Sequence, residues 1–138
     1  AFTAMFVALY GLNKWKTEHK GKAYFDAAKT LLSSVYSVRN NFEIVRSRWI
    51  DASELPEDYT SKNSAEDKAN ANWYVYKNRL EPLTKAMNEL DVALIEGEVL
   101  WGFEVKDEGQ KINSSFNRLV RSIKDVFREE YKGISDPR

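Results

Sequence analysis

"YFDAAKTLLSSVYSVRNNFEIVRSRW" (residues 24–49) repeats apolar residues at alternating intervals of four and three. This alternation places the apolar residues on one face of an α-helix and is typical of helices that pack together lengthwise. Leu32 and Ile44 widen the face, as expected for a helix that contacts more than one neighbour. We call the row of apolar residues at this alternating spacing the seam of the helix; it consists of Tyr24, Ala28, Leu31, Val35, Val38, Phe42, Val45 and Trp49.

Residues 65–101 repeat the same alternation. Ser64 stands three residues before Asp67, a spacing that predicts a capping box at the start of this helix. Pro82 lies inside the pattern and has no N–H to donate, so we predict a bend near it. Gly97 indicates either close approach of a neighbouring backbone or a weak point near the helix end, and both explanations stay open. The seam consists of Ala69, Trp73, Tyr76, Leu80, Leu83, Met87, Leu90, Leu94, Gly97 and Trp101.

Turn-forming residues separate these patterns. The stretch "DASELPEDYTSKNS" (51–64) contains Pro56 and predicts an exposed acidic loop. The stretch "GFEVKDEG" (102–109) predicts a short turn before a third helix, which we expect to end at Lys132 and Gly133. The apolar stripe of the third helix comprises Ile112, Phe116, Leu119, Ile123 and Val126, with Val120 and Phe127 beside it.

These patterns predict an all-α protein. The expected architecture is an elongated antiparallel three-helix bundle of up-down-up order, with helices at about 14–50, 65–101 and 108–132. At about 1.5 Å per residue, the second helix is about 55 Å long. Counted back along an antiparallel first helix, this length places Trp101 near Trp15. The long first helix is then expected to project beyond the bundle.

Residues 1–13 are predicted to be an apolar helical extension of a bundle formed by residues 14–138. Their apolar side chains occupy several faces, which is typical of a helix covered by lipid or by other chains. A run of about 12 residues spans about 18 Å, so it cannot cross a hydrocarbon core of about 30 Å on its own. We interpret the run as the end of a membrane helix; the alternative is a helix end that packs against a second copy or a partner. The residues expected to face membrane or partner are Phe2, Met5, Phe6, Leu9, Leu12 and Trp15.

Charge is unevenly distributed, although 21 basic and 21 acidic residues give a net charge of zero. Residues 1–22 carry a net charge of +3, and residues 51–67 carry −5. Lysines directly after an apolar segment follow the positive-inside rule, so we predict a single-pass inner-membrane protein with a cytoplasmic helical domain. The alternative is a soluble cytoplasmic protein. The lack of a basic surplus argues against nucleic-acid binding. The lysines expected to face headgroups are Lys14, Lys16, Lys20 and Lys22.

The stretches "ALYGLNKWKTEHKGKAYFDAAKTLL" (8–32) and "LDVALIEGEVLWG" (90–102) resemble a group of uncharacterised bacterial proteins. Those proteins have one N-terminal transmembrane helix, an exit rich in tryptophan and lysine, and a cytoplasmic helical region. The resemblance covers most of the chain and implies a membrane-anchored helical domain. It implies no activity and no site residues. The chain departs from the pattern because it lacks the first part of the membrane helix.

Signatures of catalysis or metal binding are absent from the sequence. A di-iron bundle requires Glu-x-x-His pairs, but the one histidine, His19, lies among lysines. The chain has no cysteine, and its six glycines are scattered and form no phosphate-binding loop. The antiparallel arrangement of the first two helices brings Trp49 and Trp73 to the same end of the predicted bundle, where they could line a ligand pocket. We expect no catalytic residue, no metal and no cofactor.

The expected function is therefore not enzymatic. We predict a membrane-anchored helical interaction or scaffold domain that presents a coiled-coil surface to a partner or to itself. Membrane lipid or partner helices are expected to contact residues 1–15, and a homo-oligomer is one form of this hypothesis. The alternative is a soluble helical adaptor that oligomerises through its apolar N-terminal helix segment. A small-ligand-binding or catalytic helical bundle is the third hypothesis.

Overall fold

Three long α-helices make up the fold, and no β-strand occurs in the part of the chain that the structure describes. The prediction of an all-α protein with three helices is confirmed. The computed structural model describes the backbone of residues 2–60 and 64–135, and the side chains of residues 20–60, 64–130, 132 and 133. The elements are α1 (Phe2–Arg46), a short 3-10 helix η1 (Ala52–Glu54), α2 (Ala65–Trp101) and α3 (Phe103–Ser135).

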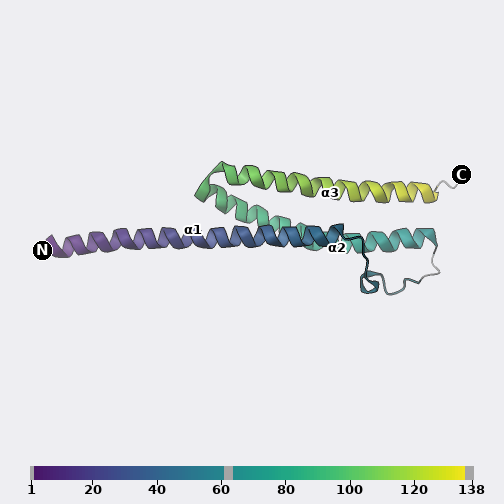
Figure 1. Cartoon of the computed structure of the whole chain (residues 1–138), viewed down its shortest axis with the longest axis horizontal. Helices are drawn as coiled ribbons and strands as arrows, with labels where there is room; N and C mark the ends of the chain where they lie inside the picture. Colours follow the sequence, from purple (N-terminus) through teal and green to yellow (C-terminus); the bar gives the residue numbers. More distant parts are fainter. Residues whose placement is uncertain (1, 61–63, 136–138) are drawn as a thin grey trace.

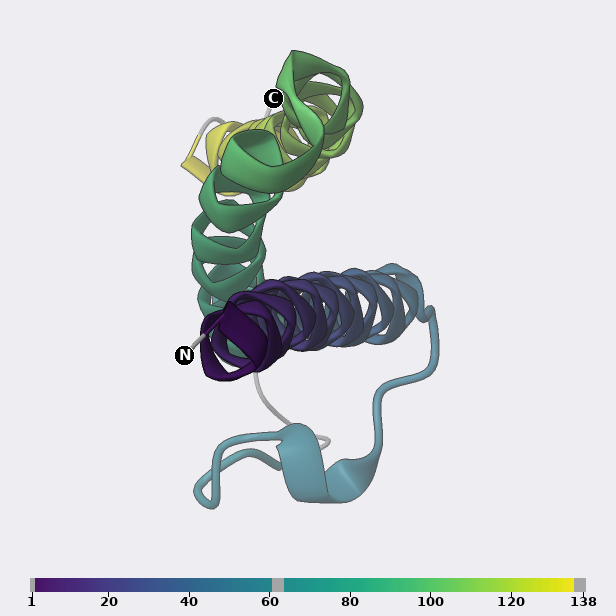
Figure 2. The same ribbon diagram turned by 90° about the vertical axis from the view of Figure 1, so that its left-hand side faces the viewer.

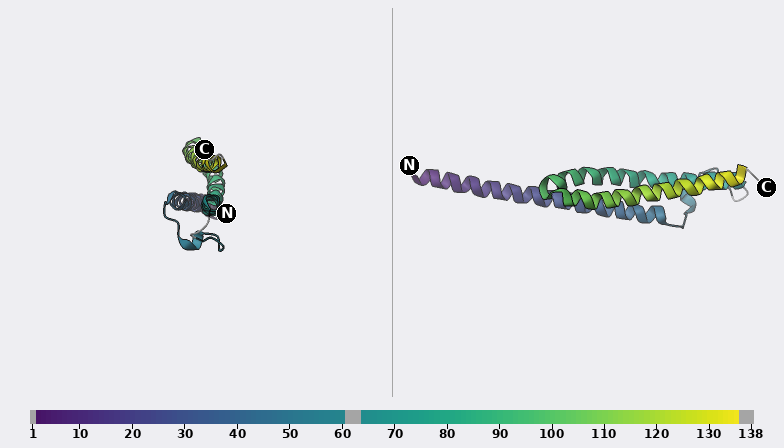
Figure 3. Two further views of the ribbon diagram at one scale, coloured as in Figure 1. Left: turned by 90° about the vertical axis from the view of Figure 1, so that its right-hand side faces the viewer. Right: turned by 90° about the horizontal axis from the view of Figure 1, so that it is seen from above.

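The second helix is the centre of the packing, because both α1 and α3 contact it. Figure 1 shows α1 and α3 running in one direction and α2 in the opposite direction. Viewed along the long axis, α1 and α3 lie apart, with α2 passing between them (Figure 2). Seen from above, the N-terminal part of α1 continues beyond the turn that joins α2 to α3 (Figure 3).

Apolar residues of all three helices meet in one core. Leu83 and Leu90 of α2 are fully buried, Val45 of α1 is 1% exposed and Phe127 of α3 is 7% exposed. Burying a side chain of this size contributes about 1.5–3 kcal/mol. On α3 the predicted stripe residue Ile123 is buried together with Phe127, whereas the predicted stripe residue Val126 is 63% exposed.

The start of α2 is the capping box that the sequence predicts. The Ser64 Oγ accepts a hydrogen bond from the Asp67 N–H at 3.1 Å, and the Asp67 carboxylate accepts one from the Ser64 N–H at 3.0 Å. The two bonds satisfy N–H groups that have no partner within the helix. The helix continues through Pro82, and Figure 1 shows it changing direction in its middle part.

The first helix ends at Arg46 and not at about Ile50, so that prediction is wrong. The last turn of a helix leaves carbonyl groups without a helical partner. Here the side chain of Arg79 donates hydrogen bonds to the carbonyls of Ile44 and Ser47, at 3.3 Å and 2.9 Å. Two carbonyls at the point where the chain leaves the helix therefore have a side-chain partner.

The third helix begins at Phe103 and ends at Ser135, so the predicted range of 108–132 is wrong at both ends. The expected turn at 102–109 is a single residue, Gly102, with a φ of 90°. Only glycine adopts this backbone region readily, so one residue reverses the chain and the next helix starts at once. Glycine is also tolerated near a helix end, and α3 continues through Gly133.

The predicted register between α1 and α2 is also wrong. The ring of Trp101 contacts Tyr24, edge to face, with 6.1 Å between ring centroids. Tyr24 lies nine positions after Trp15, which corresponds to about 13 Å along a helix. The shift arises because the N-terminal part of α2 extends past the end of α1, so the two helices are not level at that end (Figure 1).

Two glycines allow α2 and α3 to approach closely beside this turn. A Cβ atom at Gly97 would lie 3.0 Å from Val105 Cγ1, and a Cβ atom at Gly109 would overlap the side chain of Leu94. Of the two explanations left open for Gly97, the structure therefore favours close approach of a neighbour. Gly109 has the same role on α3, although the sequence pattern did not indicate it.

Candidate functional site

Arg79 lies on the side of α2 that faces α1, and it is only 7% exposed. Its position follows from helical spacing: it stands four residues after Val75, which is fully buried, and four residues before Leu83. Residues four apart share one face of a helix, so this spacing carries a charged side chain into an apolar interface. A guanidinium group in such a place must form hydrogen bonds with protein groups.

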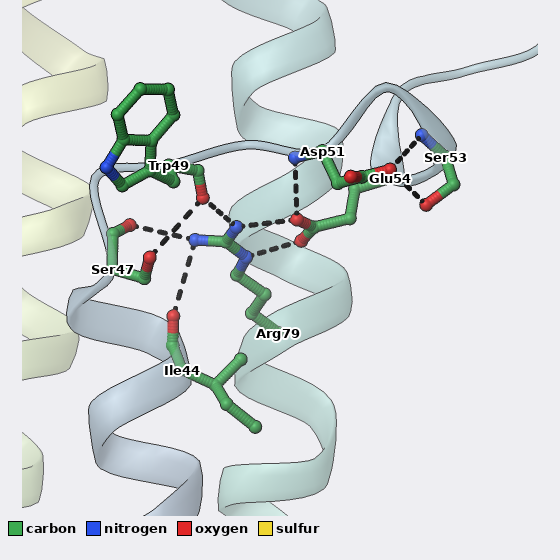
Figure 4. A network of polar contacts seen from close by, with 7 residues as sticks. All are labelled: Ile44, Ser47, Trp49, Asp51, Ser53, Glu54 and Arg79. Carbon is green, nitrogen blue, oxygen red and sulfur yellow. Dashed lines mark hydrogen bonds and ion pairs between the residues drawn. The ribbon is translucent and has the colours of Figure 1, made fainter.

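All five N–H groups of the Arg79 guanidinium donate hydrogen bonds (Figure 4). Two reach the Glu54 carboxylate, from Nε to Oε2 at 2.5 Å and from Nη2 to Oε1 at 2.7 Å. Three reach main-chain carbonyls: Nη1 donates to Ile44 at 3.3 Å and Ser47 at 2.9 Å, and Nη2 to Trp49 at 2.6 Å. We call these five residues the arginine clasp.

The short helix η1 positions Glu54 for this contact. Asp51 caps η1, because its carboxylate accepts hydrogen bonds from the N–H and the hydroxyl of Ser53, at 2.9 Å and 2.7 Å. Glu54 Oε1 in turn accepts the Asp51 N–H at 3.0 Å. The predicted acidic loop therefore contains a capping box that holds one of its carboxylates against Arg79.

The ionised forms of both clasp partners are stabilised. The hydrogen bonds from Arg79 lower the pKa of Glu54 below its usual 4.5, and the Asp51 N–H adds to this effect. The hydrogen bonds to Glu54 raise the pKa of Arg79. Hydrogen bonds from Ser53 lower the pKa of Asp51. The clasp therefore stays charged throughout the neutral range.

The arrangement of the clasp is structural rather than catalytic. Its guanidinium has no N–H left to bind a substrate, because all five are used within the protein. Two parallel bonds between arginine and a carboxylate set both distance and orientation. What the clasp does is join the end of α1, the connection after it and α2 into one unit.

A groove runs between α1 and α3 and has a volume of about 690 Å³. Its floor is apolar, with Val35, Phe42 and Ile112 half-buried, while Arg39 and Arg46 lie exposed on the α1 side. The groove exists because α2 separates the two helices that flank it (Figure 2). We call it the α1–α3 groove; its lining residues are Val35, Val38, Arg39, Phe42, Glu43, Arg46, Ser47, Ile112 and Ser115.

The predicted pocket between Trp49 and Trp73 is not formed. Trp49 is 87% exposed, whereas the Trp73 ring packs edge to face on Phe127 with 5.2 Å between centroids. The two side chains separate because α1 ends before Trp49, so the helical seam no longer directs that side chain toward α2. Trp49 was placed on the seam by spacing alone, and spacing has no meaning beyond the helix end.

Most of the side chains predicted to face membrane or headgroups lie outside the described residues, although their backbone belongs to α1. Lys20 and Lys22 are the two that the structure describes, and both are exposed. Within the described residues, no helix has a stretch long and apolar enough to span a bilayer. The side chains that stay untested are Phe2, Met5, Phe6, Leu9, Leu12, Lys14, Trp15 and Lys16.

The chain was compared with protein families, curated proteins and solved structures, and none of them matches it. The resemblance to membrane-anchored bacterial proteins therefore stays a prediction. Within the described part of the chain, no group of three or more histidine, aspartate or glutamate side chains is arranged to hold a metal ion.

Sequence reasoning missed both charged members of the clasp. A second apolar stripe on α2 could have indicated Arg79, because this arginine interrupts it at a core position. Glu54 had no such signal, since acidic residues are common in exposed loops and spacing cannot pair residues across a connection. The stripe consists of Ala71, Val75, Ala86 and Ala93.

Proposed function

We propose that this chain is the helical part of a membrane-anchored interaction or scaffold protein, and that it works without catalysing a reaction. In this proposal the packed helices form an up-down-up bundle, α1 projects from it, and residues 1–13 continue a membrane helix. The bundle lies on the cytoplasmic side of the bacterial inner membrane. The observation that carries the proposal is the length of α1, a single helix over Phe2–Arg46.

The continuity of α1 supports this role because one rigid helix joins two unlike segments. The apolar N-terminal segment is followed by four lysines, and the packed half begins at about Tyr24. A helix without a break between them would hold the packed helices at a set distance from a membrane surface. Exposed Lys20 and Lys22 would then lie on the membrane side of the bundle.

The alternative is a soluble adaptor that oligomerises through the same apolar segment. It is supported by the same continuity, because helices of several copies could bury residues 1–13 against one another. The third hypothesis, a ligand-binding bundle, is supported by the α1–α3 groove. A groove with exposed arginines on one side resembles a docking surface more than an enclosed ligand site.

Vesicle flotation of the full chain tests the proposal. With vesicles of phosphatidylglycerol, we expect the protein to float, and with phosphatidylcholine alone we expect less binding because the lysines lose their attraction to anionic lipid. Leu9→Glu should lower the bound fraction at least about tenfold, since a charge in the apolar segment opposes insertion. Leu32→Glu is the matched control on the packed half of α1, where Leu32 is 57% exposed, and it should float normally.

The soluble-adaptor alternative predicts different results for flotation and sedimentation. If the protein remains in the dense fraction with both vesicle types and sediments as an oligomer that Leu9→Glu converts to a smaller species, the soluble adaptor replaces the membrane proposal. If Leu9→Glu changes neither property, both roles of the segment are contradicted.

A further inference from the structure

The clasp presents one large apolar side chain to solvent. Trp49 is 87% exposed, more than any other large apolar side chain that the structure describes. Its carbonyl accepts a hydrogen bond from Arg79 Nη2 at 2.6 Å and another from Ser47 Oγ at 3.4 Å. In Figure 4 its ring points away from the guanidinium that holds its main chain. Because its main chain is already held, binding of the Trp49 indole costs the ordering of its side-chain rotamers but no further ordering of the backbone.

The α1–α3 groove has the chemistry that an indole requires. Its floor offers apolar contact to Val35, Phe42 and Ile112. Arg39 and Arg46 place two guanidinium groups at its edge, and arginine attracts the face of a tryptophan ring. The volume of about 690 Å³ leaves room for one indole side chain and its neighbours.

We propose that Trp49 of one copy inserts into the α1–α3 groove of a second copy, and that the second copy does the same in return. One chain carries both the exposed anchor and the complementary groove, which favours a second copy over any other occupant. Ser47 lines the groove and lies two residues before Trp49, so both features stand at the same end of α1. A two-fold axis through this end allows both contacts to form at once and closes the dimer.

The proposal goes beyond the proposed function and does not depend on it. Self-association through Trp49 uses the end of α1 opposite to residues 1–13, so a membrane-anchored chain and a soluble one could both dimerise in this way. Failure of membrane binding would leave this contact unaffected.

Site-directed cross-linking tests the contact itself, because the natural chain has no cysteine. An Arg48→Cys variant with a size tag is mixed with an untagged Ser115→Cys variant, and a short bismaleimide is added. Arg48 adjoins Trp49 and Ser115 lines the groove, so we expect a cross-linked dimer of mixed size. Val92→Cys, which is also exposed but lies on α2, replaces Ser115→Cys in the control and should give at least about tenfold less product.

Sedimentation equilibrium measures how much the anchor contributes. Trp49→Ala should weaken dimerisation at least about 30-fold, the effect of losing a buried tryptophan at the centre of an interface. Ser115→Trp should weaken it similarly, since a ring at this exposed position fills the groove without disturbing the core. Phe103→Ala removes a side chain that is 74% exposed elsewhere, and it should change dimerisation less than about twofold.

The proposal is overturned if the wild-type protein is monomeric at about 0.1 mM, well above the affinity range of specific complexes. It is also overturned if Trp49→Ala leaves self-association unchanged, or if the Val92→Cys control cross-links as well as the groove variant. Loss of vesicle binding by Trp49→Ala, with self-association intact, would assign the indole to lipid instead.

Discussion

The two ends of the packed helices are held together in different ways. At the clasp end, the connection from Ser47 to Ser64 is long, and Arg79 ties it down with five hydrogen bonds. At the turn end, Gly102 alone joins α2 to α3, and α1 continues past this point (Figure 3). The clasp end depends on the Arg79 side chain, which bonds several polar groups. The turn end depends on the positive φ of Gly102, which residues with a Cβ atom rarely adopt.

This difference corresponds to the two ways in which α1 is placed: it ends at the clasp, but it continues past the turn between α2 and α3. The clasp binds one carbonyl of the last turn of α1 and two carbonyls of the connection after it, and so holds this connection against α2. At the turn end, the structure describes the close approach of α2 and α3 at Gly97 and Gly109, and two partly exposed contacts: the Tyr24–Trp101 ring contact and the ion pair between Lys106 and Glu98, at 3.1 Å. The backbone of α1 continues as a helix past this end toward Phe2.

The largest effect is expected from removing the clasp. Arg79→Leu removes the arginine donor from the Glu54 carboxylate and from three carbonyls, of which those of Ile44 and Trp49 keep a bond from Ser47, and we expect a loss of about 2–4 kcal/mol in the free energy of unfolding. Arg79→Lys keeps the charge but has a single ammonium in place of the planar fork, so it should recover only part of this loss. Urea unfolding followed by circular dichroism measures both. A loss below about 1 kcal/mol for Arg79→Leu would show that the clasp does not hold the end together.

The turn end is tested by glycine substitution. Gly102→Ala places a Cβ atom on a backbone with a φ of 90°, and we expect a loss of about 1–3 kcal/mol. Gly21→Ala is the matched control within α1, where an added Cβ meets no atom within 4 Å. It should stabilise the protein by up to about 1 kcal/mol, because alanine favours the helix. If the two variants change the unfolding free energy in the same direction, backbone conformation does not distinguish these sites.

Acid should weaken the clasp end selectively. The pKa of Glu54 is lower in the folded protein than its usual 4.5, so its contribution is complete above that value and disappears as the pH falls through the lower folded pKa. Glu54→Gln should cost about 1 kcal/mol at pH 7 and should flatten the stability profile between about pH 5 and pH 3. Asp51→Asn must be measured beside it, because the pKa of Asp51 is lowered too. A wild-type profile as flat as that of Glu54→Gln would contradict the assignment.

The smallest effect is expected at Trp49. Its side chain is 87% exposed, so Trp49→Ala should change the unfolding free energy of the monomer by less than about 0.5 kcal/mol. Trp73→Ala is the comparison, because Trp73 packs on Phe127 in the core, and its loss should reach about 3 kcal/mol. Thermal unfolding at low protein concentration measures both. A large loss for Trp49→Ala would mean that the indole is packed within its own chain.

The spacing of residues in the sequence correctly predicted those features that depend on residues close together in the chain. The seam of α2 and its Ser64 capping box lie where the pattern places them, because both depend on local spacing. The ends of α1 and α3 were wrong because they depend on single residues outside any period: Arg79, which reaches across to α1, and Gly102, which turns the chain by itself. Trp101 contacts Tyr24 and not Trp15 because the start of α2 lies beyond the end of α1, an offset that spacing within either helix does not indicate.

The candidate sites were less predictable for the same reason. The apolar character of the groove floor follows from the seams, since Val35, Phe42 and Ile112 were all seam residues. The groove itself could not be predicted, because the pattern does not say that α2 keeps α1 and α3 apart. The exposure of Trp49 could not be predicted either, because it follows from the early end of α1.

Hydrogen exchange along α1, measured with and without phosphatidylglycerol vesicles, tests most directly whether its N-terminal segment requires an external partner. The proposed role predicts slow exchange in residues 27–46 under both conditions, because this half packs on α2. Residues 2–13 should exchange quickly in dilute buffer and at least about 100-fold more slowly on vesicles, where lipid covers the helix. Equal exchange of residues 2–13 under both conditions would contradict the account.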